Sequence, residues 1–546
     1  MLPSLASKRR PETGEAQSGG GKRMDGSRQQ LDLAQRVTRA IGFGMMHAVW
    51  AEVQPDKVAI FDPDGRTRTF GQLNANANRI ARLLREAGLK PGEGVALLCT
   101  NRAEFAEVMS GAMRVGLRLT PINWHMTAEE IAYVIKDCEA KALFADAAVA
   151  TAQEAAASCP DLRLKVAIGG AIGGFADYDA TLGQMDATDI PDPMRGYTML
   201  YTSGTTGRPK GVYKPSHPGP AYSHDYDREH DLHMCLGPAY HAAPLMGDVR
   251  RPLLNGVPLV FMDKWDSEKV LRTIAEKKVT NAHFVAIMFQ RLLALPEAVK
   301  RSYDVSSMKT VSHGAAPCPP EVKRAMIEWF GPVLSEYYAG SEGGAGFIIK
   351  SEEWLRKPGS VGRRPSKEAA IILDEEGNEC PPNVPGAIYM KVPAEGFEYF
   401  KDPGKTQGAR RGGLFTMGDI GYLDEDDYLF LTGRSAETII SGGVNIYPQE
   451  VDNELIKHPA IEDACTVGAP NDEWGEEVVS VIQLKAGHEP SEKLAEEILA
   501  HARAALARYK QPRRLEFVEA LPRSEAGKIL RNRVRAPFWE GRTRQI

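Results

Sequence analysis

Residues 201–211 of this 546-residue chain read YTSGTTGRPKG. Glycine lets a backbone turn sharply and approach a ligand closely, with its N–H group directed inward. Serine and threonine add hydroxyl donors, and Lys210 adds a mobile positive charge. The residues just before, 197–201, are aromatic and β-prone, so we expect a strand that leads into a polyphosphate-binding loop. The alternative is a flexible linker, but linkers rarely carry so ordered a pattern.

The spacing is not the Walker pattern, because Gly211 and not a hydroxyl residue follows Lys210. The segment resembles the phosphate loop of the adenylate-forming enzymes, a family of acyl-CoA synthetases, luciferases and nonribosomal peptide adenylation domains. The resemblance implies that Thr205 takes part in catalysis and helps to hold Mg²⁺. It also implies that these residues contact ATP: Thr202, Ser203, Gly204, Thr205, Thr206, Gly207 and Lys210.

A second segment of the chain, residues 335–344 (SEYYAGSEGG), follows in the family's order. By resemblance, Tyr338 stacks on adenine, Ser341 binds the α-phosphate, and Glu342 holds Mg²⁺ and acts in catalysis. A flat aromatic ring suits a purine, and a carboxylate oxygen suits magnesium. Taken alone, the segment could equally be a glycine-rich turn with a surface glutamate. The small residues of 312–317 (SHGAAP) resemble the loop that lies along adenine: Gly314, Ala315 and Ala316.

Two further segments resemble the ribose and coenzyme A contacts of the family. Asp419, in 415–421 (FTMGDIG), corresponds to the acid that binds both ribose hydroxyls, a natural task for a carboxylate. Arg434 corresponds to the ribose-contacting arginine at the domain junction. Without the resemblance, these would be a turn acid and an exposed arginine. Residues 438–448 (TIISGGVNIYP) contain a turn that meets the pantetheine arm of coenzyme A, or else a plain hairpin: Ser441, Gly442 and Gly443.

The last matching segment is residues 522–531 (PRSEAGKILR). Lys528 resembles the catalytic lysine that bridges the attacking carboxylate and the α-phosphate. Negative charge grows on the phosphate oxygens in that transition state, so a placed ammonium stabilises it selectively. A solvated basic tail is the alternative. One departure concerns the hinge, where Ala436 replaces the family's usual Asp or Lys and Glu437 comes next.

The substrate side is indicated by residues 237–244 (GPAYHAAP). His241 resembles the histidine beside the carboxylate in acyl-CoA synthetases, although a packed core histidine is the alternative. Amino-acid-activating relatives place an aspartate nearby, whereas this chain has Ala242 and Ala243. Residues 283–290 are also mostly apolar. We therefore expect an apolar carboxylic acid of the medium- or long-chain fatty type, or an aromatic or polycyclic acid.

Strand-like and helix-like runs alternate over residues 58–146 and again over 257–286, which predicts an α/β fold. The predicted organisation is a disordered extension over 1–27, an ATP- and acid-binding domain over 28–434, and a small mobile α+β domain over 435–546. Met24 is a candidate natural start. Thr127 should cap a helix. The seven cysteines are dispersed, which fits a reducing compartment and predicts a cytoplasmic protein.

The net charge of −5 with interspersed signs gives no indication of nucleic acid as a partner. No apolar run approaches about 18 residues, so we expect no transmembrane helix. The combined prediction is an AMP-forming acyl-CoA synthetase that uses ATP, Mg²⁺ and coenzyme A, with a homodimer as an option. The first alternative is an acyl-adenylate ligase that delivers to a carrier protein. A luciferase-type oxygenase and a non-catalytic binding protein are the others.

Overall fold

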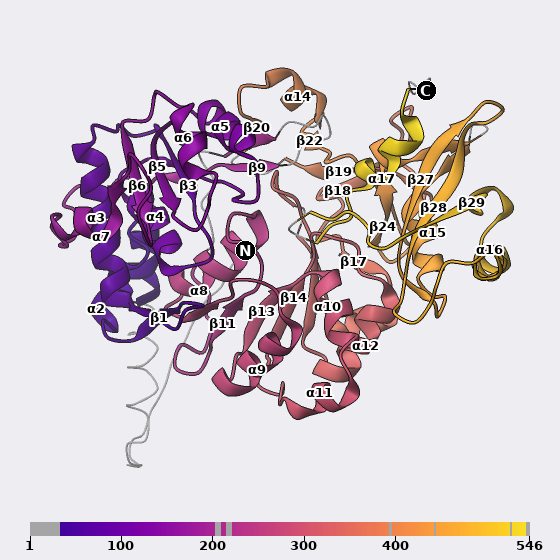
Figure 1. Ribbon diagram of the computed structural model, residues 1–546, viewed down its shortest axis with the longest axis horizontal. Coiled ribbons are helices and arrows are strands. Elements are labelled where there is room, and N and C mark those ends of the chain that lie inside the picture. Colours follow the sequence, from indigo (N-terminus) through magenta and orange to yellow (C-terminus); the bar gives the residue numbers. More distant parts are fainter. Residues whose placement is uncertain are drawn as a thin grey trace, which may run out of the picture.

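The computed structural model describes residues 33–202, 209–214, 221–344, 346–392, 396–441, 444–524 and 527–541. These residues form a mixed α/β structure with five β-sheets, which confirms the predicted fold class. The chain runs from a parallel sheet at one side to a mixed, mainly antiparallel sheet at the other (Figure 1). Within the described ranges, no helix combines the length and apolar character needed to span a bilayer.

The first layer is a six-stranded parallel sheet with helices around it. All five residues of β3 are buried, as expected when helices cover both faces of a parallel sheet. Its strands are β7 (Ala176–Asp177), β6 (Leu164–Ile168), β5 (Ala140–Asp146), β3 (Gly94–Leu98), β4 (Arg118–Pro121) and β8 (Tyr197–Thr198). The helices before and within it are α2 (Ala48–Val53), α3 (Phe70–Glu86), α4 (Ala103–Arg114), α5 (Ala128–Asp137), α6 (Ala152–Ala157) and α7 (Tyr178–Gly183).

The second layer is an eight-stranded sheet that is parallel except at its two edges. Its strands are β16 (Phe347–Lys350), β15 (Leu334–Tyr338), β14 (Thr310–His313), β13 (Asn281–Phe284), β11 (His233–Cys235), β12 (Leu259–Phe261), β1 (Val58–Phe61) and β2 (Thr67–Thr69). Its helices are η1 (Pro244–Arg250), α8 (Arg251–Leu254), α9 (Ser267–Lys277), α10 (Ala286–Leu293), α11 (Glu297–Ser302), α12 (Pro320–Phe330) and α13 (Ser351–Arg356). Parallel strands bring their carboxyl ends to one edge, where ligand sites form in such sheets.

Helix starts follow the local chemistry of the sequence. The Thr127 side chain accepts from the Glu130 backbone N–H, and the Glu130 side chain accepts in return from the Thr127 N–H. This capping box satisfies donors that the first turn leaves free, and the predicted cap is confirmed. Helix α9 stops at Lys278, which takes a left-handed conformation with φ of 54°.

Residues 360–434 form an antiparallel sheet that the sequence patterns did not predict. Its strands are β17 (Ser360–Arg363), β24 (Tyr428–Arg434), β23 (Asp419–Leu423), β19 (Gly386–Lys391), β22 (Leu414–Phe415), β21 (Arg410–Arg411) and β18 (Ala370–Leu373). A smaller antiparallel sheet combines β20 (Glu398–Tyr399), β10 (Lys210–Tyr213) and β9 (Leu200–Thr202), with helix α14 (Pro403–Gly408) beside it. This smaller sheet joins the end of the predicted phosphate loop to the 398–408 segment.

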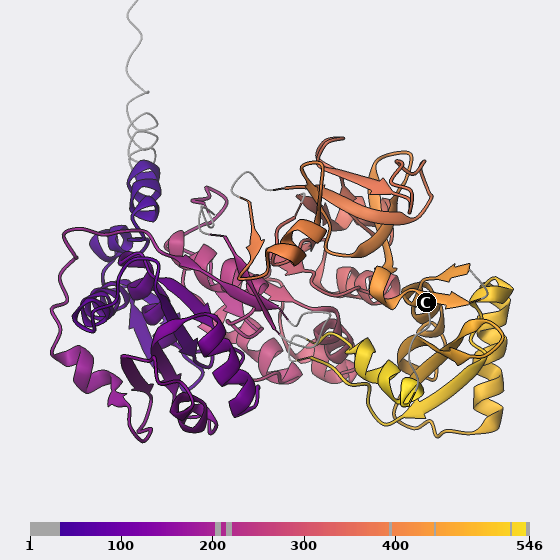
Figure 2. The same cartoon turned by 90° about the horizontal axis from the view of Figure 1, so that it is seen from above.

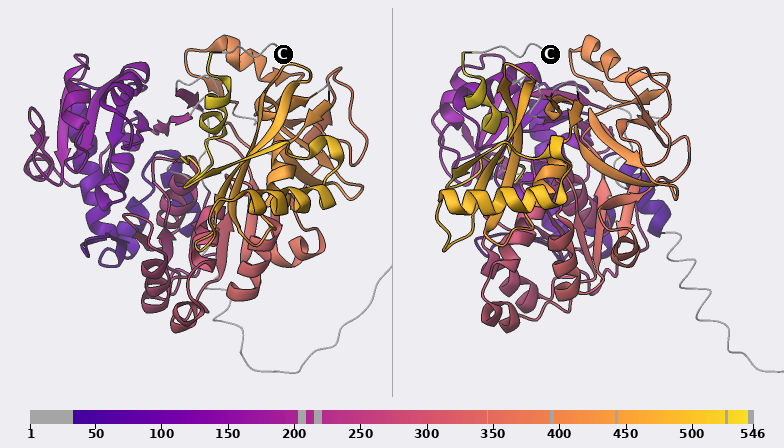
Figure 3. Two further views of the ribbon diagram at one scale, coloured as in Figure 1. Left: turned by 45° about the vertical axis from the view of Figure 1, so that its right-hand side comes forward. Right: turned by 90° about the vertical axis from the view of Figure 1, so that its right-hand side faces the viewer.

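The strands after Arg434 pair only with one another and have their own apolar clusters. They lie at the far end from β3–β8 (Figure 2), and Figure 3 turns this part toward the viewer. The chain passes from the preceding sheets to this part through a 3₁₀ turn, η2 (Ser435–Glu437). The elements are β25 (Ile439–Ser441), β26 (Val444–Ile446), α15 (Pro448–Leu455), β27 (Ile461–Asn471), β28 (Gly475–Leu484), α16 (Glu492–Ala505), η3 (Arg508–Lys510), β29 (Arg514–Val518), α17 (Arg531–Arg535) and η4 (Ala536–Trp539).

Candidate active site

Strands β9 and β10 hold the two ends of the predicted phosphate loop. Thr202 and Lys210 are cross-strand partners, so the hairpin brings them side by side. The Lys210 Nζ atom lies 3.3 Å from an Asp402 carboxylate oxygen. The predicted strand 197–201 was wrong in one respect: β8 and β9 are separate strands in different sheets. Five predicted contacts lie outside the described residues: Ser203, Gly204, Thr205, Thr206 and Gly207.

Tyr338, Asp419 and Arg434 come together at the junction of three strands. The Tyr338 hydroxyl donates to Asp419 Oδ2 at 2.7 Å, and Arg434 Nε lies 2.9 Å from Asp419 Oδ1. Asp419 and Arg434 are cross-strand partners on β23 and β24. Burial and the Asp419 carboxylate raise the pKa of Tyr338, so its hydroxyl stays a donor. These are the three residues that the sequence predicted for adenosine.

The loop after β14 carries the predicted adenine-facing residues, Gly314 to Ala316. A Cβ atom added at Gly314 would lie 2.7 Å from the Tyr337 carbonyl oxygen and 2.8 Å from the Tyr337 ring, so only glycine fits. Ala315 has φ of 65°, which is unusual for a residue with a side chain. Backbone conformations of this kind cluster at ligand sites. The strain is thus an observation that favours a binding role for this loop.

Glu342 lies in the turn after β15, next to Ser341. The Tyr399 hydroxyl donates to Glu342 Oε1 at 2.8 Å, and burial together with the Glu342 charge raises the pKa of Tyr399. A Cβ atom added at Gly340 would lie 2.2 Å from Met417 Sδ and 3.1 Å from Glu342 Oε2. Met417 therefore fills the space that the absent Gly340 side chain leaves beside the predicted magnesium ligand.

Lys528 reaches this group from the far end of the chain. Its hairpin is closed by a backbone hydrogen bond from Ser524 to Lys528 at 2.7 Å. Gly527 packs so closely against α10 that an added Cβ atom would lie 2.4 Å from Ile287 Cγ2. Lys528 is exposed to solvent, although protein atoms surround its side chain closely enough to desolvate it in part. Burial, and then the nearby Arg434 charge, lower its pKa.

His241 lies three residues before η1 and is close enough to Lys528 to feel its charge. Burial first, and then the charges of Lys528 and His125, lower the pKa of His241 to about 4. The imidazole is thus neutral at physiological pH. Its Nε2 atom is buried and has no hydrogen-bond partner among the described residues. A neutral ring with an unpaired nitrogen is suited to contact a polar group of a ligand.

The predicted coenzyme A turn is not brought into this group. Ser441 ends β25, while Gly442 and Gly443 lie outside the described residues. On the far side of the turn, Asn445 Nδ2 donates to Glu375 Oε1 at 3.3 Å, a contact with the β18–β19 connection. Among the described residues, no contact joins Ser441 to Lys528. The arrangement therefore presents the Lys528 hairpin and not the glycine turn to the site.

Sequence reasoning missed several residues that hold the site together. Tyr399 binds Glu342, and Asp402 pairs with Lys210. Lys405 lies close enough to feel the charges of Lys210 and Glu342. Asp402 does leave a readable signal, because its side chain caps α14 ahead of a proline. That signal predicts a helix start, however, and says nothing of a partner 192 positions away in the sequence.

Ala436 stands at the hinge position where the family usually has Asp or Lys, and the next residue, Glu437, forms an ion pair. Arg531 Nε lies 3.1 Å from Glu437 Oε2, and Arg531 Nη2 lies 2.8 Å from Asp452 Oδ2. Arg531 follows Lys528 by three positions, so the same arginine anchors the lysine hairpin and contacts the hinge. Burial alone would lower the pKa of Arg531. The charge of the neighbouring Asp452 outweighs this effect, so the pKa of Arg531 is raised.

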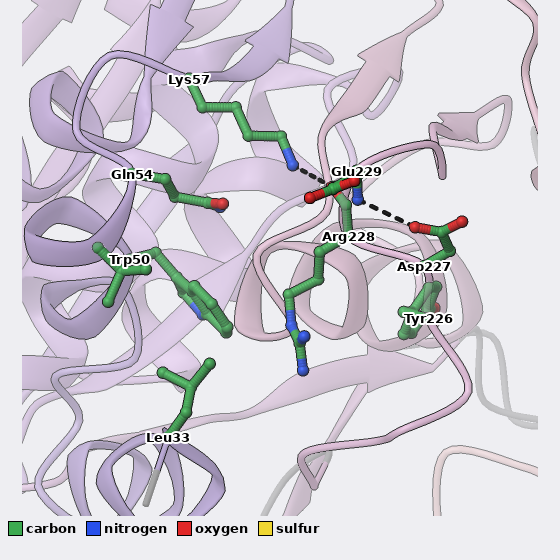
Figure 4. A pocket seen from close by; sticks show the side chains of 9 residues that line it. Leu33, Trp50, Gln54, Lys57, Tyr226, Asp227, Arg228 and Glu229 are labelled. Carbon is green, nitrogen blue, oxygen red and sulfur yellow. Dashed lines mark hydrogen bonds between the residues drawn. The ribbon is translucent and has the colours of Figure 1, made fainter. Parts of the chain in front are cut away.

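A separate cavity of about 700 Å³ lies beside α2 (Figure 4). Arg228 lies over the Trp50 ring at 5.5 Å, and Lys57 donates to the carbonyl oxygens of Arg228 and Gly256. None of the residues predicted for ATP, acid or coenzyme A lines it. Arg228 and Lys57 are already engaged with this ring and these carbonyl oxygens. We therefore interpret the contacts around the cavity as an anchor of the 221–231 segment onto α2.

The assembled groups fit a magnesium nucleotide and a carboxylic acid. An aromatic ring suits a purine, the two oxygens of a carboxylate suit a ribose diol, and a lysine suits an α-phosphate. Both Asp419 oxygens are engaged by Tyr338 and Arg434 in this structure, so a ribose would share or replace these contacts. Glu342 supplies the hard oxygen that magnesium prefers. The strained Ala315 loop lies next to the Tyr337–Tyr338 pair that would face the base.

Comparisons with known proteins identify the family of the chain. The AMP-binding enzyme family matches residues 48–399, and the AMP-binding enzyme C-terminal domain matches 450–528. A 2-succinylbenzoate–CoA ligase of Geobacillus kaustophilus is 33% identical over 89% of this chain and 96% of its own length. A fatty acid–[acyl-carrier-protein] ligase, ScoC of Streptomyces coeruleorubidus, is 30% identical over 88% of this chain and 94% of its own.

Among solved structures, the anthranilate CoA ligase AuaEII in complex with anthranoyl-AMP matches with a TM-score of 0.81. That match covers 91% of this chain and 97% of the other, at 24% sequence identity, so it supports the fold alone. The family match covers more than half of the chain, and the first relative is similar over almost its full length. The chain therefore belongs to the AMP-binding enzyme family of adenylate-forming proteins.

Proposed function

We propose that this protein is an ATP-dependent, AMP-forming carboxylate–CoA ligase. The observation that carries the proposal is the meeting of Lys528, His241 and Glu342 with the Tyr338–Asp419–Arg434 group. These residues are spread over positions 241–528 of the chain. Of the two relatives, one joins a carboxylic acid to coenzyme A and the other joins a fatty acid to an acyl-carrier protein, which supports an acid ligase in this chain as well.

In the first half-reaction, the acid's carboxylate oxygen attacks the α-phosphorus of ATP, and the bond to pyrophosphate breaks. Lys528 would hold the attacking carboxylate and the α-phosphate oxygens together, where negative charge accumulates. His241, neutral in its surroundings, would line the carboxylate without repelling the lysine. Asp419 would bind the ribose hydroxyls, and Glu342 with Thr205 would hold Mg²⁺, which neutralises phosphate charge when bound.

In the second half-reaction, the thiol of coenzyme A attacks the acyl carbon and AMP leaves. We propose that the residues after the η2 turn move as a unit for this step, so that the Ser441–Gly443 turn replaces the Lys528 hairpin at the site. Separate sheets and separate apolar clusters on the two sides of η2 support such a movement. This proposal keeps the predicted boundary after Arg434.

We propose an apolar acid of the fatty, aromatic or polycyclic class as the substrate. Ala242, Ala243 and Leu245 follow His241, and no aspartate stands there to pair a substrate ammonium. The protein should act in the cytoplasm, since all seven cysteines are free thiols. A homodimer is a further option that size-exclusion chromatography would decide.

Release of AMP and pyrophosphate from MgATP, measured over a panel of carboxylic acids with and without coenzyme A, tests the proposal. The panel runs from acetate through palmitate to benzoate, cinnamate and a steroid acid. We expect AMP formation that depends on coenzyme A for one group of acids. Pyrophosphate release that ignores coenzyme A and responds to an acyl-carrier protein would favour the carrier-protein ligase. Absence of both products with every acid would contradict acid activation itself.

A further inference from the structure

Lys405 and Lys210 bring two positive charges to one corner of the candidate site. Lys210 begins β10, and Lys405 belongs to α14, which lies beside β20 of the same small sheet (Figure 1). Burial first, and then the proximity of the Lys210 ammonium, lower the pKa of Lys405. Two neighbouring ammonium groups repel each other, and a negative group between them would remove that repulsion.

The carboxylate at this corner is already engaged with Lys210 and with the start of α14. Asp402 Oδ2 lies 3.3 Å from Lys210 Nζ, and Asp402 Oδ1 accepts the Lys405 backbone N–H at 2.9 Å. Among the described residues the Lys405 ammonium forms no ion pair, and the carboxylates near it act through charge alone. The side chains of Lys210 and Asp402 are 21% and 40% exposed, and Lys405 is also partly exposed. A ligand can therefore reach both ammonium groups from solvent.

The position of Lys405 is fixed by the residues around it. The Tyr399 backbone N–H donates to Thr406 Oγ1 at 2.9 Å, and the Thr406 hydroxyl donates to the Asp402 carbonyl oxygen at 2.9 Å. Lys405 Nζ lies 4.4 Å from the centroid of the Tyr399 ring, a cation–π contact. The hydroxyl of the same ring donates to Glu342. One tyrosine thus holds the ammonium beside the predicted magnesium ligand.

Contacts and charges connect this corner to the residues predicted for adenosine. Tyr338 donates to Asp419, and the Glu342 charge acts on Tyr338. The Glu342 charge acts on Lys405 as well. The groups therefore follow one another from Asp419 through Glu342 to the two lysines. MgATP has its own groups in the same order: the ribose, the α-phosphate, and then the β- and γ-phosphates that share the magnesium ion.

We propose that Lys405, together with Lys210, binds the β- and γ-phosphates of ATP and the pyrophosphate that they become when the bond to the α-phosphorus breaks. The inference rests on the proposed function, because it takes the Tyr338–Asp419 group as the adenosine end of the site. A phosphate oxygen between the two ammonium groups would accept from both. AMP lacks these phosphates, so Lys405 adds to the affinity for ATP and pyrophosphate and not to the affinity for AMP.

Binding of MgATP and of AMP, each measured by isothermal titration calorimetry without acid or coenzyme A, tests the inference. We expect Lys405→Met to weaken MgATP binding about tenfold, the effect of one charge-assisted hydrogen bond, and to leave AMP binding unchanged. Lys405→Arg should keep most of the MgATP affinity. Asp402→Asn retains a side chain that caps α14 but removes a competing negative charge, so it should strengthen MgATP binding by about two- to fivefold. The matched control is Lys401→Met, because the Lys401 ammonium contacts Asp137 and Glu139 instead.

Unchanged MgATP binding by Lys405→Met would overturn the inference. A loss of affinity that extends equally to AMP, or that Asp402→Asn shares, would overturn it too, because either result would show that this segment only supports the fold of the site. Exchange of labelled pyrophosphate into ATP separates this inference from the proposed function. A preference for MgATP over AMP that depends on Lys405, in a protein that forms no AMP with any acid, would uphold the lysine pair and contradict the ligase. AMP formation that requires an acid, with an unchanged KM for pyrophosphate in Lys405→Met, would uphold the ligase and reject the lysine pair.

Discussion

Lys528 lies near side chains of both charges, so the effect of replacing it depends on how these neighbours hold it. Glu342 and Asp419 act on it in one direction and Arg434 in the other. Its place depends on Gly527, whose missing side chain lets the hairpin close onto Ile287. The position of the lysine thus depends on the packing of the adjacent Gly527 more than on contacts of the Lys528 side chain. Removing that side chain should therefore leave the fold intact.

Lys528→Ala should slow acyl-adenylate formation by roughly 10²–10³, as for other donors that stabilise developing charge. Single-turnover release of pyrophosphate measures this step. Thioester formation from a chemically prepared acyl-adenylate should change little. Lys510→Ala, which removes a lysine bound to Glu450 elsewhere in the same region, is the matched control. Near-normal adenylation by Lys528→Ala would refute the assigned role.

The pH dependence of adenylation should report Lys528. A lowered lysine pKa means that the needed ammonium is lost as pH rises, and lost below the ordinary pKa of a lysine. The pH profile of kcat/KM for ATP should therefore fall on its alkaline side earlier than a free lysine would. Lys528→Arg should move that fall to higher pH. His241, with a pKa of about 4, should give no inflection near 6.5.

The Gly340–Met417 contact predicts a compensating pair. Gly340→Ala places a methyl group where Met417 Sδ lies, next to Glu342. We expect a loss of adenylation of roughly tenfold, since overpacking typically costs about 1–3 kcal/mol. Met417→Ala in the same protein should restore most of the activity. A double variant as impaired as the sum of both single variants would contradict direct contact.

The helices and strands differ in how well they can be predicted from their sequences. The alternation of strands and helices over 58–146 and 257–286 and the Thr127 cap of α5 were predicted, because apolar runs and cap residues act locally. The antiparallel sheet of 360–434 was not, since its strands are short and their burial patterns irregular. The π-helix η1 was also missed, because its sequence reads as an ordinary apolar helix. The same applies to the site, where long-range partners such as Tyr399 leave no local pattern.

The anchoring of α17 to α15 gives a stability prediction for one element. Arg531 and Asp452 are both buried and lie 2.8 Å apart, and Asp452 also accepts from the Thr466 backbone at 2.6 Å. Asp452→Ala leaves an uncompensated buried cation, which should lower the free energy of unfolding by about 3–5 kcal/mol. Urea denaturation measures it. Glu454→Ala, which breaks a more exposed pair with Lys457, should cost less than about 1 kcal/mol.

The whole molecule consists of two parts joined by one pass of the chain at η2. Glu437 stands next to the alanine that occupies the hinge position, and its bond to Arg531 connects the hinge to the lysine hairpin. The pair exists in the arrangement that presents Lys528 to the site. We therefore expect Glu437 to favour the first half-reaction over the second.

Glu437→Gln should slow adenylation by about two- to fivefold, the effect of a partly exposed ion pair. Thioester formation from the acyl-adenylate should be unchanged or faster. The two half-reactions are measured separately, by pyrophosphate release and by acyl-CoA formation. Glu462→Gln, at an exposed position in β27, serves as the control. A loss confined to thioester formation would show that Glu437 assists the movement and does not restrain it.

The packing of Gly527 on Ile287 has a consequence for the reactive anhydride that the first step leaves behind. In the proposed first step, the same close packing that positions the Lys528 hairpin would also keep water away from the acyl-adenylate on the side of α10. If the residues after η2 move as proposed, hydrolysis of the acyl-adenylate and its transfer to the thiol would compete only after that movement. The yield of thioester per ATP would therefore depend on whether the thiol or water reaches the acyl-adenylate first.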